Sequence, residues 1–124
     1  FTGTSGANSV ATTIINSSGA FVSNIANVSV ASANTATTID TIDNTMYRSA
    51  KYIVQVTNGS NYQSQEVLVV QNGTTPQIVT YGTVSTGGNL GVMSASISGS
   101  TVNVQFIAAN ASTNVRVMRN YNLI

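Results

Sequence analysis

The chain has no cysteine, no histidine and no tryptophan, and only one of its 124 residues is proline. Without cysteine and histidine it cannot build a Ser-His-Asp or Cys-His nucleophilic system, or the usual zinc, haem and iron–sulfur sites. Its stability cannot depend on disulfide bonds. We therefore expect no catalytic residues, no cofactor and no metal site of these kinds.

Charge is also scarce. The chain has four basic and three acidic residues, so that 6% of its residues are charged and the net charge is +1, against about 25% charged residues in a typical soluble domain. A net charge near zero gives little repulsion between copies and favours association. Polarity comes instead from hydroxyls and amides, with 33 serine or threonine residues and 15 asparagines.

Long hydrophobic runs are absent as well. No stretch of about 18 apolar residues occurs, and no basic-then-apolar start resembles a signal peptide, so we expect no contact with a membrane. The first residue is Phe1, which suggests a processed product or a portion of a longer polypeptide. Hydrophobic residues make up 42% of the chain, enough for one domain with its own core.

The N-terminal 36 residues are low in complexity and rich in small side chains. A period of two at Ala26, Val28 and Val30 indicates a short strand. Two interpretations stay open. Residues 1–36 form either the first one or two strands of the domain or an extended arm that lies on a neighbouring subunit. We place the main domain at residues 37–124.

The strand pattern is clearer from residue 37 onward. Ile39 and Ile42 have opposite parity, which predicts a β-bulge or two short strands. In YRSAKYIVQVT, one face collects the side chains that we expect to be buried: Ala50, Tyr52, Val54 and Val56. The other face collects Ser49, Lys51, Ile53 and Gln55. Residues 58–61, NGSN, predict a tight turn.

Five further strands are expected. In YQSQEVLVVQ the apolar run from Val67 to Val70 predicts an end covered on both faces. QIVTYGTVS places Val79 and Tyr81 on one face and Ile78 and Val84 on the other. LGVMSASIS and TVNVQFIAA form a hairpin through residues 98–100, with two alternating sets: Met93, Ala95 and Ile97, then Val102, Val104, Phe106 and Ala108. TNVRVMRNYNLI sets Val115 and Val117 against Arg116 and Met118.

Strands recur every 10 to 15 residues with turn residues between them, and no segment has a helical period. The sequence therefore predicts an all-β fold, an antiparallel β-sandwich or jelly-roll-like domain of roughly seven to nine strands.

The acids are Asp40, Asp43 and Glu66. A glycosidase needs two carboxyl groups facing each other across a cleft, and calcium needs six to eight oxygen ligands. Asp40 and Asp43 could contribute to one calcium ion, but the EF-hand spacing is absent. We expect both to be turn or strand-end carboxylates exposed to water.

The basic residues are Arg48, Lys51, Arg116 and Arg119. Nucleic-acid affinity depends mainly on phosphate contacts, and four cations on two distant segments supply few. We expect isolated pairs with the acids and no binding of nucleic acid; a small basic patch would form only if the two strands are neighbours.

Aromatic residues bear on carbohydrate binding. Tyr52 and Phe106 fall on apolar strand faces and are expected in the core. The remaining four candidates lie near strand ends, where a ring packs at the rim with its hydroxyl in water: Tyr47, Tyr62, Tyr81 and Tyr121. A glycan site would require these tyrosines to cluster with asparagines in one concave patch.

Several segments resemble a known family. They are Thr38 to Asp40, the YRSAKY strand from Tyr47 to Tyr52, Glu66-Val67, Leu90-Gly91 and Val115 to Val117. Across about residues 37 to 122 the chain resembles a domain of virion structural proteins of large tailed phages of marine bacteria, notably cyanobacteria. The resemblance implies a structural or accessory virion role and carries over no catalytic residue.

We therefore expect a non-enzymatic virion protein, as a capsid decoration, neck or tail-fibre component on the particle surface. Its partners would be other copies of itself, as a homo-oligomer, and other virion proteins, through sheet packing or shared edge strands. The alternative is a receptor-binding module of a phage fibre that recognises a host-surface glycan. No ligand-binding residue is singled out by the sequence.

Overall fold

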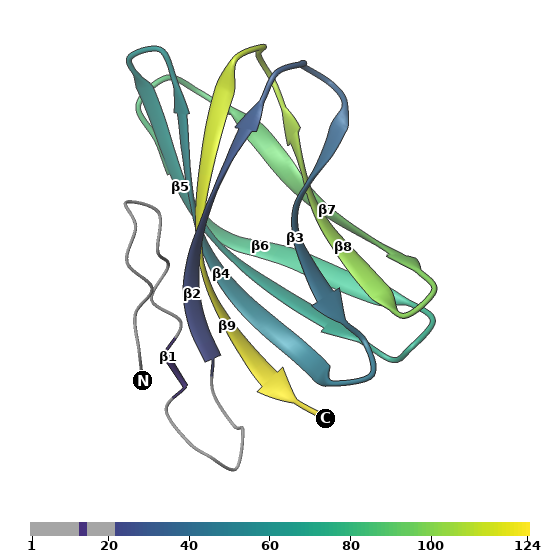
Figure 1. Cartoon of the computed structure of the whole chain (residues 1–124). Coiled ribbons are helices and arrows are strands. Elements are labelled where there is room, and N and C mark those ends of the chain that lie inside the picture. The colour runs from purple at the N-terminus through teal and green to yellow at the C-terminus, as the bar shows by residue number, and fades with distance from the viewer. Residues whose placement is uncertain (1–12, 15–21) are drawn as a thin grey trace, which may run out of the picture.

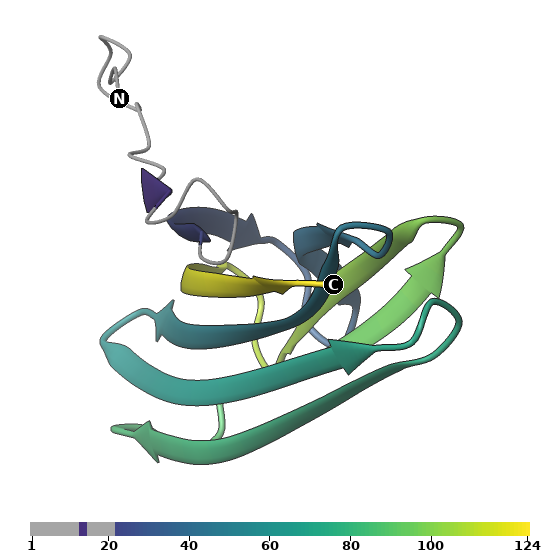
Figure 2. The ribbon, with the colours of Figure 1, turned by 90° about the horizontal axis from the view of Figure 1, so that it is seen from below.

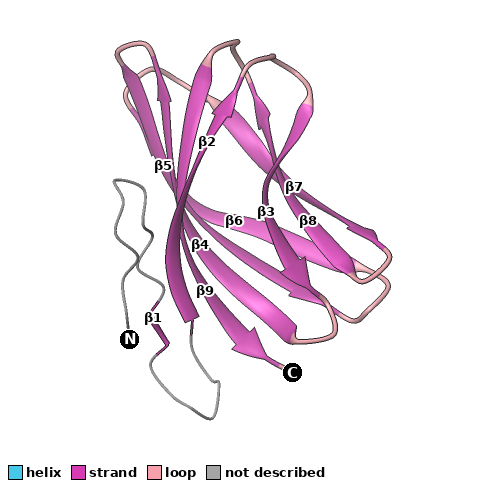
Figure 3. Cartoon of the chain, in the orientation of Figure 1, coloured by secondary structure: helices cyan, strands magenta, loops and turns pink. Residues whose placement is uncertain are grey.

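The computed structural model describes residues 13–14 and 22–124, and every regular element in that part of the chain is a β-strand (Figure 1, Figure 3). All the strand pairs are antiparallel. The strands are β1 (Thr13–Ile14), β2 (Val22–Val30), β3 (Ala36–Asp43), β4 (Tyr47–Asn58), β5 (Asn61–Gln71), β6 (Pro76–Ser85), β7 (Gly91–Ser98), β8 (Thr101–Ala108) and β9 (Thr113–Leu123). The prediction of an all-β sandwich of seven to nine strands is confirmed.

The strands form two sheets. Six strands make the larger sheet in the order β1-β2-β9-β4-β5-β6, and three make the smaller sheet in the order β3-β8-β7. Figure 2 shows the layers from below, with the smaller sheet packed on one face of the larger one. Both sheets contribute to the core between them, which is rich in valine. Within the described residues, no helix is long and apolar enough to cross a membrane.

The central hairpin consists of β4 and β5, and its residues alternate between core and solvent as predicted. The buried set on β4 is Ala50, Tyr52, Val54 and Val56. Lys51, Ile53 and Gln55 are exposed on the opposite face. A two-residue turn, Gly59-Ser60, joins the strands, and Gly59 has a φ of 60°, which glycine adopts without a steric cost.

β2 joins the larger sheet by pairing with β9 along residues 22–30. Val30 at its end is 1% exposed and belongs to the core. Most of the N-terminal segment, residues 1–12 and 15–21, lies outside the described residues. The division at residue 36 and the choice between first strands and an arm therefore stay predictions.

β3 contains the bulge that the sequence predicted. The register against β8 shifts between Thr38 and Asp40, so that the consecutive residues Ile39 and Asp40 are both buried. Ile42 is buried two positions further on. Because a bulge adds one residue to the strand, it reconciles the opposite parity of the two isoleucines and turns Asp40 toward the larger sheet.

The hairpin of β7 and β8 and the closing strand β9 also follow the sequence pattern. Gly99-Ser100 forms the turn between β7 and β8. On β8 the buried residues are Val102, Val104, Phe106 and Ala108. On β9, Val115 and Val117 are buried while Arg116 and Met118 are exposed.

Two predictions about side-chain faces are wrong. The run Val67 to Val70 is not covered on both faces, because Leu68 is 45% and Val70 is 48% exposed. The smaller sheet covers only one face of the larger sheet, so alternate residues of the run remain on the other.

Val84 was expected on the same face as Ile78, and this too is wrong. The register between β5 and β6 shifts between Glu66 and Val67, leaving Tyr81 as an extra residue in β6. Val84 therefore lies opposite Ser64, on the face turned away from the smaller sheet, and is 71% exposed.

The face assignment of β4 yields a direct prediction. Val54→Asp is expected to lower the free energy of unfolding by more than about 4 kcal/mol, because Val54 is fully buried and the new carboxylate would have no partner. Lys51→Ala removes an exposed side chain and is expected to leave the melting temperature nearly unchanged. Thermal melts followed by circular dichroism compare the two variants, and the reverse order of stability would contradict the assignment.

Candidate functional site

A buried polar cluster around Asp40 joins the two sheets. Tyr52 of β4 and Tyr121 of β9 donate hydrogen bonds from their hydroxyls to Asp40 Oδ2 at 2.7 and 2.5 Å, and Arg119 of β9 forms an ion pair with Oδ1. Asp40 is only 8% exposed. The expectation that Asp40 is exposed to water is therefore wrong, and the cause is the bulge in β3 that turns it inward.

The two tyrosines in this cluster are permanent hydrogen-bond donors. Burial, and then the negative charge of Asp40, raise the pKa of both Tyr52 and Tyr121 well above the usual value for tyrosine. Their hydroxyls stay protonated across the physiological pH range. The two hydroxyls therefore remain donors to Asp40, and these bonds hold β3 against β4 and β9.

Aromatic and cationic groups pack around the same carboxylate. The ring centroids of Tyr47 and Tyr121 lie 5.0 Å apart with the planes tilted by 43°, and the guanidinium of Arg119 lies 6.0 Å from the centroid of Tyr121. Both distances fit favourable aromatic and cation–π contacts. Tyr47 and Tyr121 are half-buried, as expected of rings that pack at strand ends.

The three carboxylates occupy three separate environments. Asp43 is the exposed last residue of β3, and its Oδ1 accepts hydrogen bonds from the Thr45 amide at 2.9 Å and the Thr45 hydroxyl at 2.6 Å. These bonds hold the pKa of Asp43 below its usual value. Glu66 points away from the core and pairs with Lys51. The structure thus confirms the exposed placement of Asp43, and it places Asp40 and Glu66 on opposite sides of the larger sheet.

The four basic residues are also dispersed. β4 and β9 are neighbours, the condition under which a basic patch was expected. Arg119 nevertheless faces inward to Asp40, and Lys51 lies 3.5 Å from Glu66. Arg48 donates to the backbone oxygen of Gln71 at 2.8 Å, and Arg116 is exposed. The expected pairing of basic residues with acids is confirmed for Lys51 and Arg119.

The tyrosines do not gather into one site. Tyr52 is fully buried, as is Phe106, which confirms both core predictions. Tyr62 is 50% exposed beside the turn between β4 and β5, and Tyr81 is 47% exposed on β6. Since Tyr47 and Tyr121 lie together beside Asp40, the four rim tyrosines are divided among at least three places. The concave tyrosine patch expected of a glycan site is not formed.

An exposed apolar surface covers the side of the larger sheet that faces away from the core. We call it the outer face, and its members are between 41% and 71% exposed: Ile53, Leu68, Val70, Val79, Tyr81, Val84 and Met118. The strand register places the Lys51–Glu66 pair among these side chains, because Ile53 lies opposite Glu66 and Lys51 opposite Leu68. Met118 lies opposite Ile53 across β9 and β4, and Leu68 lies opposite Val79 across β5 and β6.

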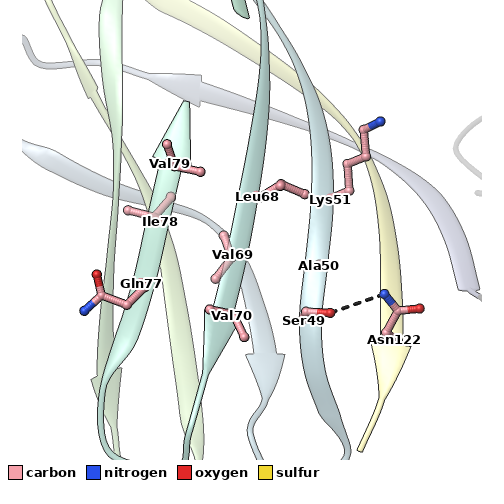
Figure 4. Close-up of a pocket in the computed structure, with 10 residues that line it drawn as sticks. All are labelled: Ser49, Ala50, Lys51, Leu68, Val69, Val70, Gln77, Ile78, Val79 and Asn122. Atoms are coloured by element: carbon pink, nitrogen blue, oxygen red, sulfur yellow. Dashed lines mark hydrogen bonds between the residues drawn. The ribbon is translucent and has the colours of Figure 1, made fainter. Parts of the chain in front are cut away.

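The outer face includes a shallow hollow of about 460 Å³ over β4, β5 and β6 (Figure 4). Leu68, Val70 and Val79 line it, together with Ser49 and Asn122, which are joined by a hydrogen bond of 3.2 Å. Lys51 stands at one end. Lys51 pairs with Glu66, so one cation and one anion lie side by side among the apolar side chains. The Tyr81 hydroxyl and the carboxylate of Glu66 raise the pKa of Lys51.

The outer face was not predicted from the sequence as an exposed surface, although one pattern indicated it. The uninterrupted run Val67 to Val70 indicated a strand that is apolar on both sides. The prediction assumed that other residues of the same chain cover both faces of this strand. Leu68 and Val70 are the residues of that run that the fold leaves in contact with solvent.

Comparison with solved structures finds similarity to tailspike proteins of Acinetobacter phages. The tailspike protein gp49 of Acinetobacter baumannii bacteriophage Fri1, a capsular polysaccharide depolymerase, aligns with a TM-score of 0.53 and 11% identity over 93% of this chain and 20% of that protein. The tailspike protein of Acinetobacter baumannii phage AM24 aligns with a TM-score of 0.49 and 10% identity over 83% of this chain and 26% of that protein. The tailspike protein of Acinetobacter phage vB_ApiP_P1 aligns with a TM-score of 0.47 and 18% identity over 83% of this chain and 22% of that protein.

No protein-family model and no curated protein matches the chain. The similarity to the Fri1 protein shows a common fold, and the chain spans about a quarter or less of each tailspike protein. All three neighbours are proteins of Acinetobacter phages. The comparisons therefore give no support to the narrower expectation of a phage of marine bacteria or cyanobacteria.

The Asp40 cluster predicts a large loss of stability when its carboxylate is removed. Asp40→Ala is expected to lower the free energy of unfolding by about 3 kcal/mol, because the buried Arg119 guanidinium and two tyrosine hydroxyls lose their acceptor. Urea titrations followed by circular dichroism measure the change. Asp43→Ala is the matched control at the exposed end of β3. Equal losses in both variants would show that the cluster does not stabilise the sandwich.

Proposed function

We propose that this chain is a non-enzymatic structural domain of a phage particle, carried by a tailspike- or tail-fibre-like protein, and that it acts by packing against further copies of itself. The observation that carries the proposal is the outer face. Seven large apolar side chains, each at least 41% exposed, lie on one side of one sheet. The fold shared with the Fri1 tailspike protein supports the placement in a phage particle.

The outer face is larger than the scattered apolar exposure of an ordinary surface. Its seven side chains together present an apolar area on the order of several hundred Å², which is the size at which a contiguous patch marks a contact with another molecule. Covering such an area contributes about 25 cal/mol for each Å² removed from water. The outer face is therefore suited to association with another protein surface.

The charges on the outer face favour a second copy as the partner. Lys51 and Glu66 lie side by side, so two copies related by a twofold axis can set the cation of each against the anion of the other. The net charge of +1 adds almost no repulsion between copies. In the assembled particle the same packing would place the domain at the virion surface beside other virion proteins.

The arrangement of the acids supports a role without catalysis. Asp40 is held by an arginine and two tyrosines, Asp43 by a threonine, and Glu66 by a lysine on the far side of the sheet. Asp40 lies between the two sheets and Glu66 on the opposite side of the larger sheet, so these two carboxyl groups do not face each other across one cleft.

Self-association through the outer face can be tested by analytical ultracentrifugation. Wild-type protein is expected to associate with rising concentration, and Leu68→Glu is expected to weaken the association at least about 10-fold, or 1.4 kcal/mol, because it buries a charge in the contact. Met46→Glu is the matched control, since Met46 has a similar exposure of 49% but lies outside the outer face.

Two outcomes would overturn the proposal. One is a wild-type protein that stays monomeric up to millimolar concentration. The other is an association that Leu68→Glu and Met46→Glu weaken equally. Activity of the purified chain on capsular polysaccharide, measured as release of reducing ends, would separately contradict the non-enzymatic part.

A further inference from the structure

The chain contains two Asn-Gly pairs, Asn58-Gly59 between β4 and β5 and Asn72-Gly73 between β5 and β6. Such a pair can react within itself, because glycine has no Cβ to hinder the attack of its backbone nitrogen on the side-chain amide carbon of the asparagine. Gly59 and Gly73 are both exposed, and the sequence alone does not distinguish the two pairs. Their hydrogen bonds do.

Three donors converge on the side-chain oxygen of Asn72. The Thr74 amide and the Thr74 hydroxyl each lie 3.0 Å from Asn72 Oδ1, and the Thr75 amide lies 2.8 Å from it. Attack on Asn72 Cγ would place negative charge on this same oxygen. Donors that already point at an atom where charge develops stabilise the transition state, so the turn is arranged to favour the attack.

The same turn positions the attacking nitrogen. The bond from the Thr74 amide to Oδ1 closes a small ring that contains both Asn72 Cγ and Gly73 N, and it therefore keeps the two reacting atoms close together. Gly73 N donates to Gln71 Oε1 at 2.5 Å, and the Gln71 amide group is itself held by two backbone carbonyls. Gly73 has a φ of 97° and open space where a Cβ would lie.

Asn58 has the opposite arrangement. Its Nδ2, the group that would have to leave, donates to the carbonyls of Ala111 and Ser112 at 2.9 and 3.5 Å and to Thr113 Oγ1 at 3.2 Å. These bonds hold the side chain of Asn58 against the loop between β8 and β9. Turning its Cγ toward Gly59 N would break them, which costs free energy. Asn58 is therefore protected by the fold.

We propose that Asn72 is a self-modification site, which loses its side-chain amide through a cyclic succinimide and becomes aspartate or isoaspartate. Gly73 N gives its proton to hydroxide and forms a bond to Asn72 Cγ. The bond from Cγ to Nδ2 then breaks, and Nδ2 leaves as ammonia after taking a proton from water. A water molecule opens the ring at either of its carbonyls. Each event consumes one water and releases one ammonia, with no change of oxidation state.

The product alters the surface at one end of the outer face. Asn72 borders a hollow of about 310 Å³ together with Val70 and Gln77, and Val70 belongs to the outer face. A carboxylate at position 72 adds one negative charge beside this apolar side chain and lowers the net charge from +1 to 0. Isoaspartate also lengthens the main chain of the turn. The modification can be measured on the monomer, so the proposal does not depend on self-association.

Incubation of the full chain in mildly alkaline buffer made with heavy-oxygen water, followed by digestion and mass spectrometry, tests the proposal. In the folded protein Asn72 is expected to react at least about 10-fold faster than Asn58, with isoaspartate and aspartate both formed and labelled. In concentrated urea the hydrogen bonds are lost, and the two sites are expected to react at similar rates.

Three results of this experiment would overturn the proposal. One is an Asn72 that stays unmodified in the folded protein, and another is an Asn58 that reacts as fast as Asn72. The third is aspartate without isoaspartate at position 72, because direct hydrolysis of the amide gives aspartate alone and needs no ring.

Thr74→Val tests the donors on Asn72 Oδ1. The variant removes the hydroxyl and keeps both backbone amides, so it is expected to slow the reaction of Asn72 at least about 3-fold. Thr45→Val is the matched control, because the Thr45 hydroxyl makes a similar bond to Asp43 in a different turn. Circular dichroism establishes that both variants are folded. An unchanged rate in Thr74→Val, or equal slowing in Thr45→Val, would contradict the role given to the Thr74 hydroxyl.

Discussion

The carboxylate of Asp40 is the polar contact on which the union of the two sheets depends. The sheets share no strand pairing, so they are held by the valine-rich core and by side chains that cross between the layers. A buried carboxylate is costly unless every partner is present. Arg119, Tyr52 and Tyr121 come from the two strands at the centre of the larger sheet and supply those partners. The cluster therefore fixes how β3, and with it the smaller sheet, lies on the larger one.

The position of the smaller sheet determines which surfaces of the larger sheet remain exposed. The smaller sheet has three strands and covers one side of the larger sheet, which leaves Leu68 and its apolar neighbours on the other side uncovered. At the free edges of β6 and β7 the layers do not close, and a hollow of about 450 Å³ lies there. The outer face is apolar with one ion pair, whereas this hollow is lined largely by hydroxyl and amide side chains.

Sequence reasoning succeeded where a property repeats along one strand. The faces of β4 and β8, the turn at Gly59-Ser60 and the bulge at Ile39 all follow from parity and turn chemistry within short segments. It failed where the partner is distant. Asp40 meets Arg119 across 79 positions of sequence, and no local pattern predicts that contact.

The extra residue at Tyr81 has a consequence for how such a protein can change over generations. Loss of a single codon at that position would restore regular pairing between β5 and β6, with Thr83 still opposite Gln65 and Val84 still opposite Ser64. The outer face would lose one aromatic ring, and the residues that follow in β6 would keep their sides of the sheet. A one-residue deletion is thus a short mutational route by which a lineage could trim this face while keeping the same sandwich.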